Sequence, residues 1–71
     1  MKYTEMVKEV LNIFGNDDYN VKLALEEELK HTIYDGMTSF IFKMYDKRIE
    51  IRRELIFLND DFEENWSIKE L

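Results

Sequence analysis

The 71-residue chain has no cysteine, no proline, two glycines and one histidine. Without cysteine it forms no disulfide, no thiolate metal site and no cysteine nucleophile. Without proline, no stretch has the composition of a rigid linker, so we expect residues 1–71 to form a single small domain. The two glycines lie 21 residues apart and cannot form a glycine-rich phosphate loop.

The chain also lacks long apolar runs. None approaches the roughly 20 residues that cross a bilayer, and residues 1–6 have no apolar signal region. Small secreted proteins more often carry disulfides. We therefore expect a cytoplasmic protein with no membrane contact.

Apolar residues and acidic charge are what the chain does have. The hydrophobic fraction is 45%, with five Phe, four Tyr and one Trp, which is enough for a core. The net charge of −6 divides into −4 over residues 1–38, +2 over 39–58 and −4 over 59–71. A chain of this charge repels nucleic acid overall, so direct nucleic-acid binding is not expected. A nucleic-acid-binding regulator is a weaker alternative, and it would use the basic side chains Lys43, Lys47, Arg48, Arg52 and Arg53.

Both glycines stand where a helix is expected to end. Gly15 follows the amphipathic stretch 3–14, and Gly36 follows the stretch 21–34. Residues that favour the start of a helix come next: Asn16, Asp17 and Asp18 in one case, Thr38 and Ser39 in the other.

The second segment can be interpreted in two ways. Apolar residues recur every fourth position from Val21 to Ile33, as on a helix, but residues 19–25 also alternate as a strand would. Three adjacent glutamates at 26–28 are poor strand residues, so we predict a helix.

Residues 39–58 carry the same ambiguity. As two strands around Asp46-Lys47, they would place Lys43 opposite Glu50. As one helix, they show a broad apolar arc that only Arg48 and Arg52 interrupt. Strands would place both arginines on the outward face, which makes this pair the best local discriminator.

The last segment, residues 60–71, has a capping-box pattern in Asp61 and Glu64, with Phe62 and Trp66 one helical turn apart. We therefore predict an all-α fold, a compact three-helix bundle with a short C-terminal helix. The alternative is α+β, with terminal helices around an antiparallel meander at residues 19–57.

No catalytic, metal or cofactor residues are predicted, and the chain is not expected to be an enzyme. Glu28-x-x-His31 is half of the pattern that binds two irons in helical bundles, and the other half is missing from one chain. The acidic clusters fall at expected helix starts or polar faces, where carboxylates cap or are solvated.

The two arginines in the apolar arc also suggest an interface. Arginine and aromatic residues together are typical of interface centres, and the arc is wider than two neighbouring helices need. We predict a homodimer whose interface contains Phe40, Met44, Arg48, Ile51, Arg52 and Leu55.

Acidic residues mixed with aromatics suggest a second contact surface. The residues predicted to bind a partner are Asp60, Asp61, Phe62, Glu63, Glu64 and Trp66, together with Glu26, Glu27 and Glu28. We predict a small acidic regulator or inhibitor that occupies the basic, nucleic-acid-binding surface of a host or defence protein and imitates phosphates there. The composition, rich in Lys, Ile and Asn, is often that of phages and mobile elements. The alternative is a self-assembling structural protein.

Overall fold

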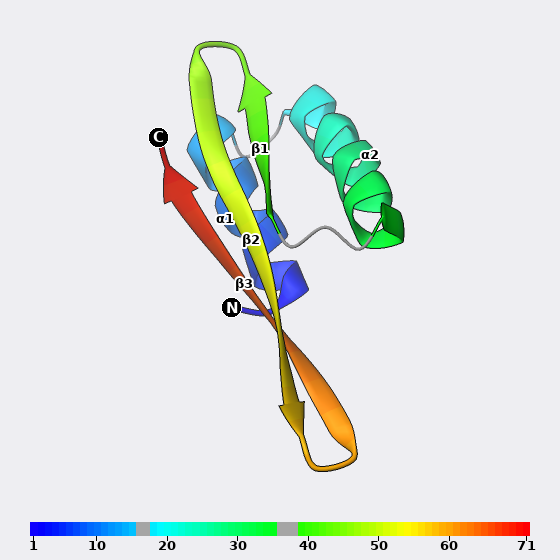
Figure 1. Cartoon of the computed structure of the whole chain (residues 1–71). Helices are drawn as coiled ribbons and strands as arrows, with labels where there is room; N and C mark the ends of the chain where they lie inside the picture. The colour runs from blue at the N-terminus through cyan, green and yellow to red at the C-terminus, as the bar shows by residue number, and fades with distance from the viewer. Residues whose placement is uncertain (16–17, 36–38) are drawn as a thin grey trace.

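The structure, a computed structural model, describes residues 1–15, 18–35 and 39–71, with backbone only for 32–35. Two helices are followed by three antiparallel strands in the sheet order β1-β2-β3 (Figure 1). No helix in these described ranges is long and apolar enough to cross a membrane. The elements are α1 (Tyr3–Phe14), α2 (Tyr19–Asp35), β1 (Ser39–Met44), β2 (Lys47–Leu58) and β3 (Asp61–Glu70).

The predicted all-α helical bundle is therefore wrong, and the fold is α+β. The predicted helix over residues 39–58 is two strands, and the predicted C-terminal helix is a third. The α+β alternative had the class right but misplaced its meander. Residues 19–35 are helical, as predicted for that segment, and the meander covers residues 39–70.

Side chains that face the helices alternate with side chains that face away from them along β1 and β2, which is the pattern of strands and not of a helix. Phe42 lies opposite Ile49, and both side chains are buried under the helices. The intervening positions point away from the helices, and Arg48 and Arg52 among them are exposed. The two-residue turn lies at Tyr45-Asp46, one residue before the position considered from the sequence. Lys43 consequently lies opposite Arg48 and not opposite Glu50.

The predicted capping box at Asp61 and Glu64 belongs to a strand. A two-residue turn, Asn59-Asp60, joins β2 to β3, and Asn59 has a φ of 55°. Asparagine tolerates this left-handed conformation better than most residues, which suits a tight hairpin. Phe62 and Trp66 therefore share one face through an alternation of two and not through a helical turn.

The predicted boundary between the first two helices is confirmed. Gly15 has a φ of 134°, which glycine adopts without strain, and its N–H donates to the carbonyl of Leu11 at 2.7 Å. Asp18 caps α2 by accepting hydrogen bonds from the amides of Asn20, at 3.0 Å, and Val21, at 3.2 Å. The boundary predicted at Gly36, including Thr38, lies outside the described residues.

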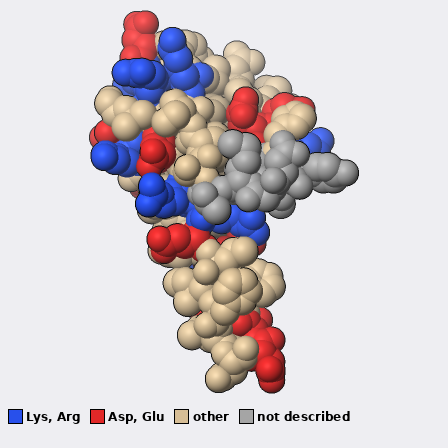
Figure 2. Space-filling model, viewed as in Figure 1, with Lys and Arg blue, Asp and Glu red and all other residues tan. Residues whose placement is uncertain are grey.

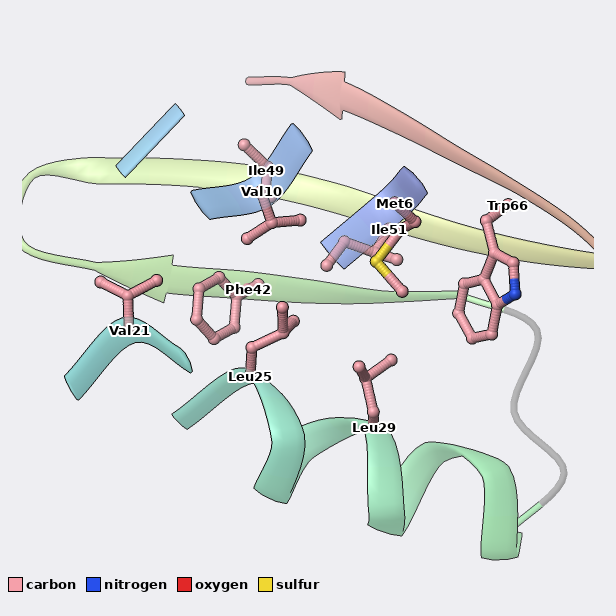
Figure 3. Close-up of a cluster of buried hydrophobic side chains, with 9 residues drawn as sticks. All are labelled: Met6, Val10, Val21, Leu25, Leu29, Phe42, Ile49, Ile51 and Trp66. Carbon is pink, nitrogen blue, oxygen red and sulfur yellow. The ribbon is translucent and has the colours of Figure 1, made fainter. Parts of the chain in front are cut away.

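Both helices pack on one face of the sheet, α1 beside β3 and α2 beside β1 (Figure 1). The side chains between these two layers form the core (Figure 3). An edge-to-face contact between Tyr3 and Trp66, with ring centroids 5.7 Å apart, closes one end of it. The fully buried apolar residues are Met6, Val10, Val21, Leu25, Leu29, Phe42, Ile49, Ile51 and Trp66. We call the sheet surface that the helices cover the helix-side face, and the opposite surface the outer face.

Asp18 predicts a pH dependence of stability. The hydroxyl of Tyr45 donates to its carboxylate, and this bond is the main reason why the pKa of Asp18 lies below its ordinary value of 3.8. A carboxylate with a lowered pKa stabilises the fold above its ordinary pKa, and that stabilisation is lost as the pH falls through the folded-state value.

We predict that Asp18→Asn has a lower Tm than the wild type near pH 7, and that this gap closes below about pH 4. Asparagine keeps a capping oxygen, so the gap reports the charge. Thermal unfolding followed by circular dichroism at a series of pH values measures it. A gap that stays constant down to about pH 2.5 would contradict the assignment.

Candidate functional site

The distal half of the β2–β3 hairpin projects from the body of the molecule (Figure 1). β1 pairs with β2 only as far as Arg52, whereas β3 pairs with β2 to the tip at Leu58. We call residues 54–65 the arm. Every residue of the arm is exposed. Because the arm extends beyond the helices and β1, the molecule is 41 Å long but only 21 Å wide. An isolated two-stranded hairpin is marginally stable in water, which makes a covered arm more stable than a bare one.

Large apolar side chains lie on both faces of the arm. Leu55, Phe57 and Phe62 continue the helix-side face beyond the core, and Ile56 and Leu58 lie on the outer face. Phe57 and Phe62 are cross-strand partners with ring centroids 6.3 Å apart, yet they are 73% and 53% exposed. No other described part of the chain covers them. A cluster of this kind on a soluble domain is typical of an interaction surface.

The arm also holds most of the net charge. The arm contains five carboxylates and no Lys, Arg or His, so it carries a charge of −5 out of the total of −6. All other residues together carry −1. In Figure 2 the arm is largely uncharged surface with acidic side chains at one edge, while basic side chains gather over the body. The five carboxylates belong to Glu54, Asp60, Asp61, Glu63 and Glu64.

A small polar network fixes the base of the arm. Glu64 accepts hydrogen bonds from Arg53 Nη2 at 3.1 Å and from Trp66 Nε1 at 3.2 Å. The side chain of Arg53 is only 16% exposed, and its Nε is buried without a partner in the described part of the chain. The backbone of Trp66 exchanges two hydrogen bonds with Met1, each 2.8 Å long. Together these contacts hold the arm in line with the sheet.

The arm has a free backbone edge. β1 begins opposite Arg52, so residues 54–58 of β2 have no described strand on that side. This edge contains Leu55, Ile56, Phe57 and Leu58, and it has none of the lysines or prolines that usually protect an exposed edge.

The predicted partner-binding residues fall in three places. Asp60, Asp61, Phe62, Glu63 and Glu64 all lie in the arm, close to one another. Trp66 is buried in the core at 1% exposure, and its indole N–H donates a hydrogen bond to Glu64 at the base of the arm. The glutamates at 26–28 lie on α2, which packs on β1 and α1 and not on the arm.

The predicted dimer-interface residues lie on two different faces. Phe40 and Met44 pack against the core, and Ile51 is completely buried in it. Leu55 is exposed on the helix-side face of the arm. Arg48 and Arg52 are exposed on the outer face.

The basic residues considered for nucleic-acid binding are also divided. Lys47 donates to the carbonyl oxygen of Ile13 at 2.8 Å, and Arg53 is bound to Glu64. Lys43, Arg48 and Arg52 remain on the outer face, where Lys69 joins them.

Sequence reasoning missed Ile56, Phe57, Leu58 and Lys69. The signal for the first three was an apolar run directly before the polar pair Asn59-Asp60, which is typical of a hairpin tip.

Other candidate sites are weaker. His31 Nε2 lies 3.3 Å from Glu27 in an exposed pair, and no group of three or more His, Asp or Glu suited to a metal occurs among the described residues. A groove of about 520 Å³ lies between the first residues of the chain and the arm. Its lining residues are Met1, Lys2, Tyr3, Glu5, Ile56, Glu63, Glu64 and Asn65.

Comparison with known proteins does not assign a function. The chain matches no protein-family model, no curated protein and no solved structure. The features of the molecule that indicate a function are therefore the exposed apolar residues and the carboxylates of the arm.

We predict that the network at the base of the arm stabilises the fold. Glu64→Ala leaves the guanidinium of Arg53 and the indole N–H of Trp66 without their acceptor, and it should lower the free energy of unfolding by about 1–3 kcal/mol. Urea unfolding followed by Trp66 fluorescence measures this loss. Glu9→Ala, at an exposed position of α1 outside the arm and the outer face, is the matched control and should change stability by less than about 0.5 kcal/mol. Equal effects of the two substitutions would contradict the role of Glu64.

Proposed function

We propose that this protein is a non-enzymatic protein-binding regulator whose arm inserts into a groove on a partner protein. The observation that carries the proposal is the exposed aromatic pair Phe57 and Phe62, at 73% and 53%, on an arm that nothing else in the described chain covers. Aromatic side chains dominate the energy of protein interfaces because they bury large areas and lose little conformational freedom.

The helix-side face of the arm is the proposed contact surface. Leu55, Phe57 and Phe62 form a short apolar ridge there, and the network around Glu64 fixes its direction relative to the core. A ridge that is already formed on paired strands loses less entropy on binding than one that must first fold, which favours a docking role.

The carboxylates define the chemistry of the partner. With −5 on the arm, the complementary surface is an apolar groove with a basic rim. Two arms pressed together by their helix-side faces would bring two such charges close to each other, so this ridge favours a different protein over a second arm.

A groove with a basic rim is typical of proteins that bind nucleic acid. The carboxylates of the arm would then take the place of phosphates, and the regulator would act as a competitive inhibitor. In this proposal the complex forms in the cytoplasm, and the composition fits a phage or mobile-element protein directed against a host or defence protein.

A second candidate function is self-assembly. The outer face of the sheet, which lies opposite the ridge, carries basic residues near the β1–β2 turn and acidic residues in the arm. This separation of charge favours self-assembly.

Site-specific crosslinking tests the proposed contact. A photo-crosslinking phenylalanine analogue replaces Phe57 in one variant and Tyr19, which is 69% exposed on α2, in the control. Both are irradiated in the source cell, and the products are identified by mass spectrometry. We expect one partner to crosslink from position 57 and not from position 19. The same products from both positions, or none from position 57, would contradict the proposal.

The affinity for a partner found in this way should depend on the aromatic pair. Phe57→Ser and Phe62→Ser should each weaken binding by about 30-fold or more, the effect of about 2 kcal/mol at an interface hot spot. Tyr19→Ser, which removes an equally exposed aromatic ring, should leave the affinity unchanged. Binding should also weaken between about 50 and 500 mM salt, and a salt-independent affinity would contradict the basic rim.

A further inference from the structure

The outer face of the sheet carries its charges in two blocks of opposite sign. Near the β1–β2 turn, four basic residues surround one glutamate, which gives +3; in the arm, three carboxylates with no basic residue give −3. The basic block contains Lys43, Arg48, Glu50, Arg52 and Lys69, and the acidic block contains Glu54, Asp61 and Glu63.

The fold does not neutralise either block. Lys43 lies directly opposite Arg48, an arrangement that destabilises a strand pair. The only ion pair recorded on the described outer face, Arg52 to Glu50 at 3.6 Å, lies within the basic block.

Within one chain the two blocks meet only at their boundary, where Arg52 and Glu54 are next neighbours on the outer face about 7 Å apart. The centres of the two blocks on β2 lie near Glu50 and Ile56. Six residues of strand separate them by about 20 Å, roughly twice the screening length at physiological salt.

We propose that the outer face binds the outer face of a second copy of this chain, with the strands of the two sheets antiparallel. The two-fold axis lies between the two sheets and runs across the strands at the level of residue 53 of β2. In this arrangement the basic block of each copy lies on the acidic block of the other. An isologous contact of this kind forms twice, once on each side of the axis. The parallel arrangement would place like charges together and is disfavoured.

The strand register names the contacts. Rotation about this axis brings Arg52 of one copy to Glu54 of the other, and Lys69 to Glu63, because Lys69 lies level with Glu50 and Glu63 level with Ile56. Arg48 reaches the level of Leu58 and its cross-strand neighbour Asp61.

Apolar side chains fill the space between the charges. Ile56 and Leu58 are 41% and 51% exposed on this face, at the levels of Glu50 and Arg48 of the second copy, and packing of the two sheets about 10 Å apart would cover them. The strands twist with one hand in both copies, so the two hairpins would wind around each other. The contact leaves the Phe57–Phe62 ridge on the opposite face accessible.

The test is the oligomeric state of charge-reversed variants. Sedimentation equilibrium at about 50 mM salt should show a dimer for the wild type and weaker association at about 500 mM. Arg52→Glu with Lys69→Glu makes the face acidic overall, and Glu54→Lys with Glu63→Lys makes it basic overall. Each double variant alone should have a dissociation constant raised at least about tenfold.

Mixing the two double variants provides the decisive result. The reversed positions 52 and 69 of one variant lie against the reversed positions 54 and 63 of the other, so opposite charges meet again and the mixture should form a heterodimer although neither variant self-associates. Lys8→Glu with Lys22→Glu, on exposed helix positions, makes the same charge change as the acidic variant and should still dimerise. Circular dichroism confirms that each variant is folded.

Three results would overturn the proposal. The first is a wild type that stays monomeric up to about 1 mM, a weak affinity even for a protein contact. The second is a dimer that survives both reversals. The third is retention of the wild type on a 20-base-pair DNA duplex, lost on Arg52→Glu with Lys69→Glu, in a chain that does not self-associate, because the basic block would then bind nucleic acid. These results leave the Phe57 crosslink unaffected, so the dimer and the partner complex can fail independently.

Discussion

Trp66 marks the position at which the covered sheet becomes a bare hairpin. Its ring packs edge-to-face on Tyr3 at 5.7 Å in the core, and its indole N–H binds Glu64 at the base of the arm. Its backbone also pairs with Met1. Trp66 therefore connects helix α1, the N-terminal residue Met1 and the arm. If it were lost, the core would lose one of its largest members and the arm would lose the reference that sets its direction.

Charge is arranged in the same divided way as burial. The body is nearly neutral overall, with basic residues on the sheet and acidic residues on the helices, while the arm is strongly acidic. Separation of this kind stores unfavourable interactions, because like charges such as Lys43 and Arg48 stand next to each other. A protein that uses its surface only for solubility has no need of such an arrangement, whereas one that binds oppositely charged surfaces benefits from it in rate and specificity.

The predictable parts of this fold are those specified by short-range rules. The periodicity of residues 3–14, the stop at Gly15 and the cap at Asp18 depend only on neighbours within one or two turns, and they were predicted correctly. Residues 39–58 satisfy the helical and the strand period together, so periodicity alone could not decide between them. The outward arginines pointed to strands, but the capping-box pattern at Asp61 and Glu64 favoured helix, and tertiary pairing overrode it.

The arm itself could not be predicted from local patterns. Its acidic residues were predicted to form a contact surface, which stays a prediction, and their arrangement depends on β2 extending past β1, a difference in strand length that only the assembled sheet reveals. For the same reason Trp66 was taken for a contact residue although it is buried. Burial of a given aromatic depends on what packs above it, which periodicity does not specify.

The free edge at residues 54–58 has a consequence for the behaviour of the protein in concentrated solution. A short run of apolar residues with high β propensity, beside which no described strand lies, is the kind of segment from which cross-β aggregation starts. The five neighbouring carboxylates act as gatekeepers, since their repulsion keeps two such edges apart. Colloidal stability is therefore tied to the carboxylates on the arm, and chains in which neutral residues replace them would be more prone to fibrous association.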